Sequence, residues 1–305
     1  MKSQPQIKVQ LTLPPATVSF SEKMYGLWQL VRADKPVGVL LLFWPTLWAL
    51  WVAGEGRPNW YVTLVFILVV LLLRSTACAV KGYADRRINM RMIHGCRQPV
   101  ASGIVQPREA IAVMIMMLTL AIYLLTSLSL TTLMMAAVTL VMAYAYMFLR
   151  RFTYFSQLIT AMVVAWVVPV SYVAIGREMD LSTVVLFLSA FLWVMVYELE
   201  HAMAHRTEDM INGVKSIALF LEDKDVLVLG ILQILLMGLF IWLGFLTGRS
   251  WFYFVASALT ALFLMRQQHL IFRDHTAGAF AAYLNNNCYG MTMFLIILGD
   301  YVITA

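Results

Sequence analysis

Long apolar stretches separated by short polar ones run along almost the whole chain. Nine of them are candidate membrane spans, near residues 38–53, 61–80, 110–126, 131–148, 157–175, 182–199, 227–246, 251–265 and 289–304. A helix needs roughly 20 apolar residues to cross a bilayer core of about 30 Å. The pattern therefore predicts an all-α polytopic membrane protein with about nine transmembrane helices.

Composition supports this class. Of the 305 residues, 62% are hydrophobic and 12% are charged, whereas a soluble domain has about 25% charged residues. The polar segment Met1–Ser21 lacks the apolar core and cleavage site of a signal peptide. The cysteines Cys78, Cys96 and Cys288 are too scattered for a disulfide framework or a Cys-rich metal site. We expect residues 1–26 to form a cytoplasmic segment and residues 27–305 to form one transmembrane domain.

The distribution of Lys and Arg predicts the orientation, because basic residues accumulate in cytoplasmic loops. If the N-terminus and every second loop lie inside, 18 of the 22 basic residues are cytoplasmic. The outer loops then contain only Arg57, Arg177 and Arg249, and Arg74 lies within a span. We therefore expect a cytoplasmic N-terminus and an external C-terminus. This topology explains the net charge of +6 without a nucleic-acid partner.

Two inner loops are long, Lys81–Glu109 and His201–Asp225. Long loops commonly carry function, whereas short ones merely connect helices. The two loops follow spans that are four helices apart, which suggests a pseudo-repeat of about 27–150 and 151–265 plus a last helix. We expect the functional site where these loops face each other on the cytoplasmic side. Pro45 and Pro169 lie inside spans and are expected to kink them.

Several short motifs resemble those of one protein family. They are Arg32–Gly38 (RADKPVG), Phe43–Trp51 (FWPTLWALW), Tyr83–Arg86 (YADR), Gly213–Ser216 (GVKS) and Leu284–Asn287 (LNNN). From about residue 27 to 300 the chain resembles the UbiA superfamily of intramembrane prenyltransferases, particularly the bacterial 4-hydroxybenzoate polyprenyltransferases of ubiquinone biosynthesis. The resemblance implies a UbiA-type helical bundle in the bacterial inner membrane, with its site on the cytoplasmic side. It also implies transfer of a polyprenyl group from polyprenyl diphosphate to the ring of 4-hydroxybenzoate.

The family binds Mg²⁺ through acidic motifs in the two long loops, because the leaving diphosphate needs its charge neutralised. The first motif is Asn-Asp-x-x-Asp-x-x-x-Asp. In this chain Lys81 stands for its Asn and Gly82 for its first Asp. Asp85 is kept, and Asn89 stands for the last Asp. The first motif has therefore lost two of its three carboxylates.

The second motif departs from the family pattern as well. Glu198 and His205 stand at two of its Asp positions, and His201 stands for the usual Tyr. Asp209 is kept, and the basic residue that ends the first loop, Arg97, comes one position early. Loss of metal stabilisation costs several kcal/mol in a transition state. We therefore expect strongly impaired Mg²⁺-dependent transfer.

The resemblance still assigns a role to each site residue. The implied catalytic residues are Asp85, Glu198 and Asp209. The implied metal ligands are Asp85, Asn89, Glu198 and His205. The implied diphosphate ligands are Lys81, Arg97, Arg206 and Lys215, and the implied partners of the aromatic acid are Arg150 and Arg151.

The residues leave other readings open. Asp85 could instead form an ion pair with Lys81 or Arg86, and Arg150 and Arg151 could serve topology alone. Glu198, His201 and His205, spaced i, i+3 and i+7, share one helical face. They could bind Zn²⁺ or Fe²⁺, or line a wet cavity.

Two other functions compete with an active prenyltransferase. The first is a non-catalytic relative that binds a prenyl chain, a quinone precursor or a partner protein. The second is a transporter, which would account for nine spans but not for the motifs in the loops.

Overall fold

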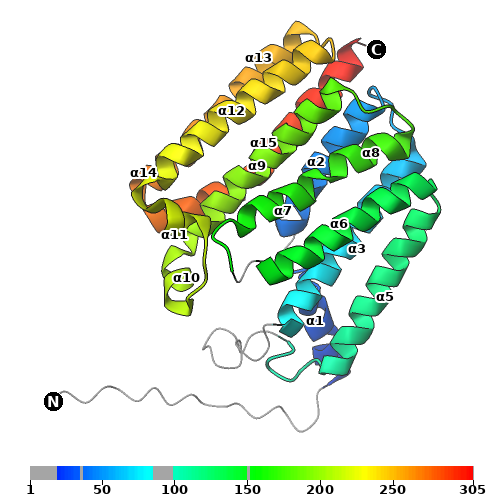
Figure 1. Cartoon of the computed structure of the whole chain (residues 1–305), viewed down its shortest axis with the longest axis vertical. Helices are drawn as coiled ribbons and strands as arrows, with labels where there is room; N and C mark the ends of the chain where they lie inside the picture. Colours follow the sequence, from blue (N-terminus) through cyan, green and yellow to red (C-terminus); the bar gives the residue numbers. More distant parts are fainter. Residues whose placement is uncertain (1–18, 35–36, 85–98, 150–151, 305) are drawn as a thin grey trace, which may run out of the picture. The chain divides into compact units, whose positions relative to one another are not determined.

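The computed structural model describes residues 19–34, 37–84, 99–149 and 152–304. Within these ranges the chain is helical and has no strand (Figure 1). The helices are α1 (Phe20–Leu30), α2 (Val37–Ala53), α3 (Trp60–Ala84), α5 (Pro107–Thr126), α6 (Leu130–Leu149), α7 (Ser156–Ala165), α8 (Val167–Ile175), α9 (Leu181–Ala204), α10 (Arg206–Asn212), α11 (Ile217–Leu221), α12 (Asp225–Leu246), α13 (Trp251–Leu259), α14 (Ala261–Arg273) and α15 (His275–Thr304), with a 3-10 turn at Glu222–Lys224. The predicted all-α class is confirmed.

Each predicted span coincides with one helix or with two consecutive helices. In the described part of the chain, six segments are both long and apolar enough to cross a membrane: Trp60–Ala84, Pro107–Thr126, Ser156–Ile175, Leu181–Ala204, Ile217–Leu246 and His275–Thr304. α2 is apolar but shorter, as is Leu130–Tyr146 of α6. The count of nine spans and the cytoplasmic N-terminus stay predictions.

The chain divides into two compact units, which are described separately. The first comprises Met1–Val39 and Leu68–Leu124, and the second comprises Leu40–Ile67 and Leu125–Ala305. The predicted single domain and its pseudo-repeat are not tested by this division. The predicted boundary after residue 26 falls inside α1, a helix that the apolar pattern did not predict.

In the first unit, α1 packs with α5 and the C-terminal part of α3 around a small core. That core consists of Leu30, Ala79, Val100, Val105 and Ala110. α1 begins after Ser19, whose backbone N–H donates to Glu22 Oε2 at 2.9 Å. An ion pair between Lys23 and Glu109 joins α1 to the start of α5.

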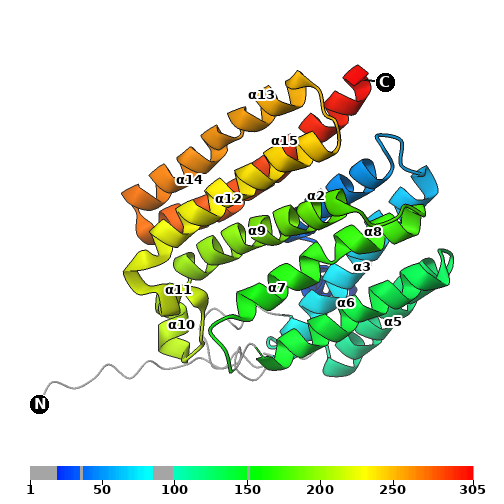
Figure 2. The same cartoon turned by 45° about the horizontal axis from the view of Figure 1, so that its top comes forward.

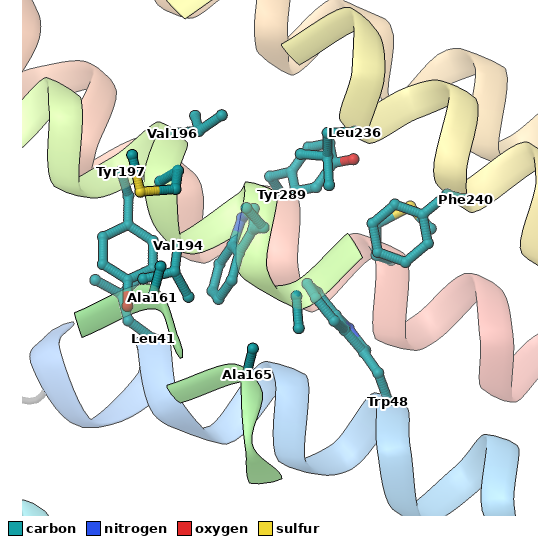
Figure 3. Close-up of a cluster of buried hydrophobic side chains, with 14 of the residues drawn as sticks. Leu41, Trp48, Ala161, Ala165, Val194, Val196, Tyr197, Leu236, Phe240 and Tyr289 are labelled. Carbon is teal, nitrogen blue, oxygen red and sulfur yellow. The ribbon is translucent and has the colours of Figure 1, made fainter. Parts of the chain in front are cut away.

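In the second unit, α9 lies in contact with α12, α15 and α7 (Figures 1 and 2). Its core includes Trp48 of α2 (Figure 3). The Trp48 ring lies 5.1 Å from that of Trp193 and 5.3 Å from that of Phe240, both edge to face. The Trp48 indole N–H also donates to the Gly290 carbonyl at 3.1 Å. These contacts join α2, α9, α12 and α15 deep in the unit.

Two predicted spans are interrupted in the structure. Residues 157–175 form α7 and α8, which meet at Trp166, three positions before Pro169. Proline has no N–H to donate to the carbonyl four positions earlier, so a break here is expected. A similar interruption at Thr260 separates α13 from α14. Pro45, by contrast, lies within an uninterrupted α2.

Three helices extend beyond the apolar runs that predicted them. α3 ends at Ala84 and α9 at Ala204, so both continue into their polar motifs. α15 begins at His275, well before the expected start at residue 289. Its early turns contain Asn285–Asn287, which lowered the apolar signal. These asparagines lie inside the helix.

Candidate functional site

The C-terminal end of α9 carries the second motif. Glu198 is half-buried, and His201 follows one turn later on the same helix. His205 is the last residue before α10, and its ring stacks on that of His201, with centroids 4.3 Å apart and planes inclined by 24°. His205 Nδ1 lies 3.0 Å from the His201 carbonyl oxygen. The predicted common face of the two imidazoles is therefore confirmed.

Aromatic side chains of α15 lie against this histidine pair. The Tyr283 ring lies 5.1 Å from the ring of His201 and 6.2 Å from the ring of Tyr197. Phe280 lies 6.5 Å from His205. Tyr197 in turn lies 5.1 Å from Trp193 of the core. A series of aromatic rings thus leads from the motif into the apolar interior of the second unit.

Arg206 holds the loop after α9 together. Its Nη2 donates to the carbonyl oxygens of Ala218 and Glu222, both at 2.8 Å. It also forms an ion pair with Asp225, whose side chain is 1% exposed. His275 Nε2 of α15 lies 3.2 Å from the same carboxylate. The predicted role of Arg206 in binding diphosphate stays a prediction, but this Nη2 already serves three internal acceptors.

Lys215 connects the second long loop to the short loop before α7. Its Nζ donates to the Phe152 carbonyl at 3.3 Å and lies 5.4 Å from the centre of the Tyr154 ring. Phe155 packs on Phe220 of α11, with ring centroids 5.0 Å apart. Lys215, a predicted diphosphate ligand, therefore lies beside Phe152 and Tyr154, which follow Arg150 and Arg151 in the sequence.

A buried polar pair, Glu200 with Asn286, joins α9 to α15 within the second motif. Asn286 Nδ2 donates to Glu200 Oε2 at 2.5 Å and to the Ala282 carbonyl at 3.1 Å. Both Glu200 and Asn286 are 0% exposed. A buried charge or amide needs such partners, because leaving it unpaired is costly. The pair therefore fixes the register of α15 against α9, the helix that leads to the histidine pair.

Several predicted site residues lie elsewhere or are not described. Lys81 is exposed in the last turn of α3 and belongs to the first unit. Asp209 lies in α10, where its backbone N–H donates to the His205 carbonyl at 2.9 Å. The remaining predicted residues lie outside the described ranges: Asp85, Asn89, Arg97, Arg150 and Arg151.

The described residues do not by themselves fit a magnesium site. No group of three or more His, Cys, Asp or Glu side chains is gathered for a metal ion in the described ranges. Magnesium prefers carboxylate and water oxygens, whereas His201 and His205 offer imidazole nitrogens. Glu198 also does not join the two histidines as a third ligand, so a zinc or iron site is not supported here.

Sequence reasoning did not find Tyr283, Phe280 or the pairing of Glu200 with Asn286. It also missed the contact of Asp225 with Arg206 and His275. A second Glu within the motif and a polar run inside an apolar helix were weak signals for the buried pair. Nothing in the sequence indicated which polar residues of α9 and α15 meet.

Comparison with known proteins identifies the family. The sequence matches the UbiA prenyltransferase family over residues 42–296. The 4-hydroxybenzoate octaprenyltransferases of Enterobacter sp. (strain 638) and Salmonella newport (strain SL254) are each 34% identical to this chain. The alignments cover 92% of this chain and 97% and 96% of those proteins. The similarity therefore extends over nearly the full length of both relatives.

Solved structures agree with this assignment at the level of the fold. The apo structure of a UbiA homolog from Aeropyrum pernix K1 matches with a TM-score of 0.72 and 19% identity, over 88% of this chain and 98% of that one. A UbiA homolog from Archaeoglobus fulgidus bound to GPP and Mg²⁺ matches with a TM-score of 0.67 and 16% identity, over 89% and 99%. The chain therefore belongs to the UbiA prenyltransferase family.

Proposed function

We propose that this protein transfers a polyprenyl group from polyprenyl diphosphate to the ring of 4-hydroxybenzoate. The observation that carries the proposal is the 34% identity to 4-hydroxybenzoate octaprenyltransferases over 92% of the chain. Because that similarity spans both long loops, it includes the two segments in which the family binds its substrates. The reaction breaks the bond between the allylic carbon and the diphosphate oxygen, and a ring carbon takes up the allylic group and loses its proton.

The geometry at the end of α9 supports this proposal. Tyr197 and Tyr283 extend an aromatic surface from the histidine pair into the apolar core. Such a surface fits an isoprenoid chain, and aromatic faces also attract a developing cation. Lys215 is exposed in the loop after α10, where it would attract a diphosphate as a point charge.

We further propose that turnover is slow because the site is poor in carboxylates. When bound, magnesium would neutralise the charge that develops on the leaving diphosphate. In the described ranges only Glu198 and Asp209 of the predicted catalytic residues are available, and the imidazole of His205 stands where a carboxylate is usual. At about 1.36 kcal/mol per tenfold change in rate, a deficit of several kcal/mol lowers turnover by orders of magnitude.

An assay with purified protein tests both parts of the proposal. Protein in detergent is mixed with polyprenyl diphosphate, radiolabelled 4-hydroxybenzoate and Mg²⁺, and prenylated product is counted. We expect slow product formation that rises when the variant Lys81→Asn/Gly82→Asp/Asn89→Asp/His205→Asp restores the carboxylates. The matched control Lys81→Gln/Gly82→Asn/His205→Asn changes three of these positions without adding a carboxylate, and it should not raise the rate.

Two outcomes would contradict the proposal. Robust turnover by the unmodified protein would contradict the idea of a slow, carboxylate-poor site. No product from either the unmodified protein or the restored variant would contradict the transferase assignment. In that case, retention of polyprenyl diphosphate on the protein would support a non-catalytic relative that binds a prenyl chain.

A further inference from the structure

A groove lies at the turn between α2 and α3, at the end of α3 opposite to Lys81. Its volume is about 550 Å³. The groove is lined by Trp51, Gly56, Arg57, Pro58, Trp60, Thr63, Leu64 and Ile67. All of these residues belong to the second unit. Apart from Arg57 and Thr63, the lining side chains are apolar.

Arg57 differs from the other two arginines of the predicted outer face. Arg177 Nη1 bonds Glu55 Oε1 at 2.7 Å. Arg249 Nη1 lies 3.4 Å from Asp300 Oδ2, and its guanidinium lies 3.6 Å from the centre of the Tyr301 ring. The guanidinium of Arg57 is exposed and makes no hydrogen bond or ion pair with any described residue. Arg57 therefore brings an uncompensated positive charge to an apolar groove.

The turn that carries Arg57 is held firmly against α15. Gly56 has a φ of +83°, and a Cβ atom there would lie 2.6 Å from the Tyr301 ring. A glycine is therefore required for both the backbone conformation and the close contact. The Arg57 backbone N–H donates to the Gly54 carbonyl at 2.9 Å, which closes the turn. The turn therefore fixes the backbone from which the Arg57 side chain extends at the rim of the groove.

Aromatic residues beside the groove are typical of a membrane–water interface. Trp60 is 75% exposed at the start of α3, and Tyr61 follows it. Trp and Tyr favour the level of the lipid headgroups. A phospholipid has its phosphate at this level and its acyl chains deeper in the membrane. The phosphate would match the positive charge of Arg57, and an acyl chain would match the apolar lining of the groove.

We propose that this groove binds one phospholipid of the surrounding leaflet, with its phosphate on Arg57 and one acyl chain along Leu64 and Ile67. The charges are complementary, because a phosphate diester supplies the anion that Arg57 lacks. Arginine is well suited to this contact, since its planar guanidinium donates two parallel hydrogen bonds to phosphate. This proposal does not depend on the catalytic activity of the protein.

Native mass spectrometry of delipidated protein in detergent tests the proposal, with dioleoylphosphatidylglycerol as the probe. We expect one lipid to be retained more tightly than the rest. Arg57→Gln should weaken its binding roughly tenfold, the effect of losing charge-assisted hydrogen bonds. Thr63→Trp, which fills the groove and leaves the cation in place, should weaken it as well. The control Arg266→Gln removes an exposed positive charge from α14 and should leave this lipid in place.

Three results would overturn the proposal. The first is equal lipid retention by Arg57→Gln and the unmodified protein. The second is an equal loss in Arg266→Gln, which would mean non-specific attraction by positive charge. The third is displacement of the lipid by inorganic phosphate alone, which would mean a site for free anions. The melting temperature of each variant, measured in the same detergent, identifies any loss of binding that comes from unfolding.

Discussion

The imidazole rings of His201 and His205 stack with centroids 4.3 Å apart. The resemblance to the UbiA family aligns these two positions with a tyrosine and an aspartate. The pair lies at the junction of α9 and α10, with Tyr283 of α15 against one ring and Phe280 near the other. The end of the helix is therefore closed by an aromatic cluster where a metal-binding carboxylate would be expected. Its effect on the reaction is testable by single substitutions.

His205→Asp should increase the activity of the protein at limiting Mg²⁺. The change adds an oxygen ligand and removes the stacking contact with His201. Because even the outer-shell partner of a metal ligand typically alters metal affinity or activity about 10- to 100-fold, we expect a gain of at least about tenfold. The measurement is the Mg²⁺ dependence of product formation. His205→Asn is the control, since it also removes the ring but adds no charge, and an equal gain in that variant would contradict a role for the carboxylate.

Arg206→Leu should destabilise the protein by about 3 kcal/mol, the scale for breaking a buried ion pair. The change leaves the Asp225 carboxylate with only its contact to His275 and frees the carbonyl oxygens of Ala218 and Glu222. Unfolding in detergent, followed by circular dichroism, measures the loss. Arg273→Leu removes a similar charge from an exposed position on α14 and should have little effect. Equal stability of the two variants would show that the Arg206 contacts contribute nothing.

Asn286→Leu should cost more stability than Glu200→Gln. Leucine removes the amide that donates to Glu200, so a fully buried carboxyl group loses its partner. This loss is expected to cost about 1–3 kcal/mol. Glutamine at position 200 keeps an acceptor for the Asn286 amide, so a smaller loss is expected. The two variants can be compared by their melting temperatures, and the reverse order would argue against the pair as a joint between α9 and α15.

Gly290→Ala should destabilise the core of the second unit by about 1–3 kcal/mol, as overpacking does. A Cβ atom at this position would lie 2.5 Å from the Trp44 ring and 3.0 Å from the Trp193 ring. Neither ring is a flexible chain end that moves aside cheaply. Gly238→Ala on α12 is the matched control, because a Cβ atom there meets nothing within 4 Å. Gly290→Ala should therefore unfold at a clearly lower temperature than Gly238→Ala.

The contribution of Asp180, the N-cap of α9, to the stability of the fold should decrease at acid pH. Burial alone would raise the pKa of Asp180, but hydrogen bonds from Ser182 and Thr183 and the charge of Arg177 outweigh it and lower the pKa. A lowered pKa means that Asp180 stabilises the fold above the ordinary carboxyl pKa of about 3.9. That contribution is lost as the pH falls through the lower pKa of the folded state.

Asp180→Ala tests this pH dependence. The loss of this N-cap should cost about 1 kcal/mol at neutral pH. The difference in stability between Asp180→Ala and the unmodified protein should shrink as the pH falls below about 3.9. Melting curves of both proteins between neutral and acid pH measure it, and a difference that stays constant would contradict the assigned cause.

The apolar pattern predicted the position of the helices well, because a backbone in lipid must satisfy its own hydrogen bonds. It failed where polar residues lie inside a helix. α15 was predicted to start at residue 289 and starts at His275, because Asn285 and Asn286 find partners on neighbouring helices. It also missed α1, since an amphipathic helix beside a membrane domain has no long apolar run.

Spacing alone predicted one contact of the candidate site. Residues four positions apart meet on a helix, so the contact of His201 with His205 followed from the sequence. The contacts of Arg206 with Asp225, and of Lys215 with Phe152, did not follow, because they join segments whose approach depends on how several helices pack. Spacing predicts which residues share one face of a helix. It does not predict which other segment packs against that face.

The sequence by itself determined the class of this protein and its family, because hydropathy and motif spacing are local properties of the chain. Only the tertiary structure decided which partners the polar and charged side chains have. Glu200 is buried against Asn286, and the Arg177 and Arg249 side chains are paired while that of Arg57 is open at a groove. The reason is physical: the energy and the partners of a charged side chain depend on the charges and the dielectric around it. Those surroundings are set by how the helices pack.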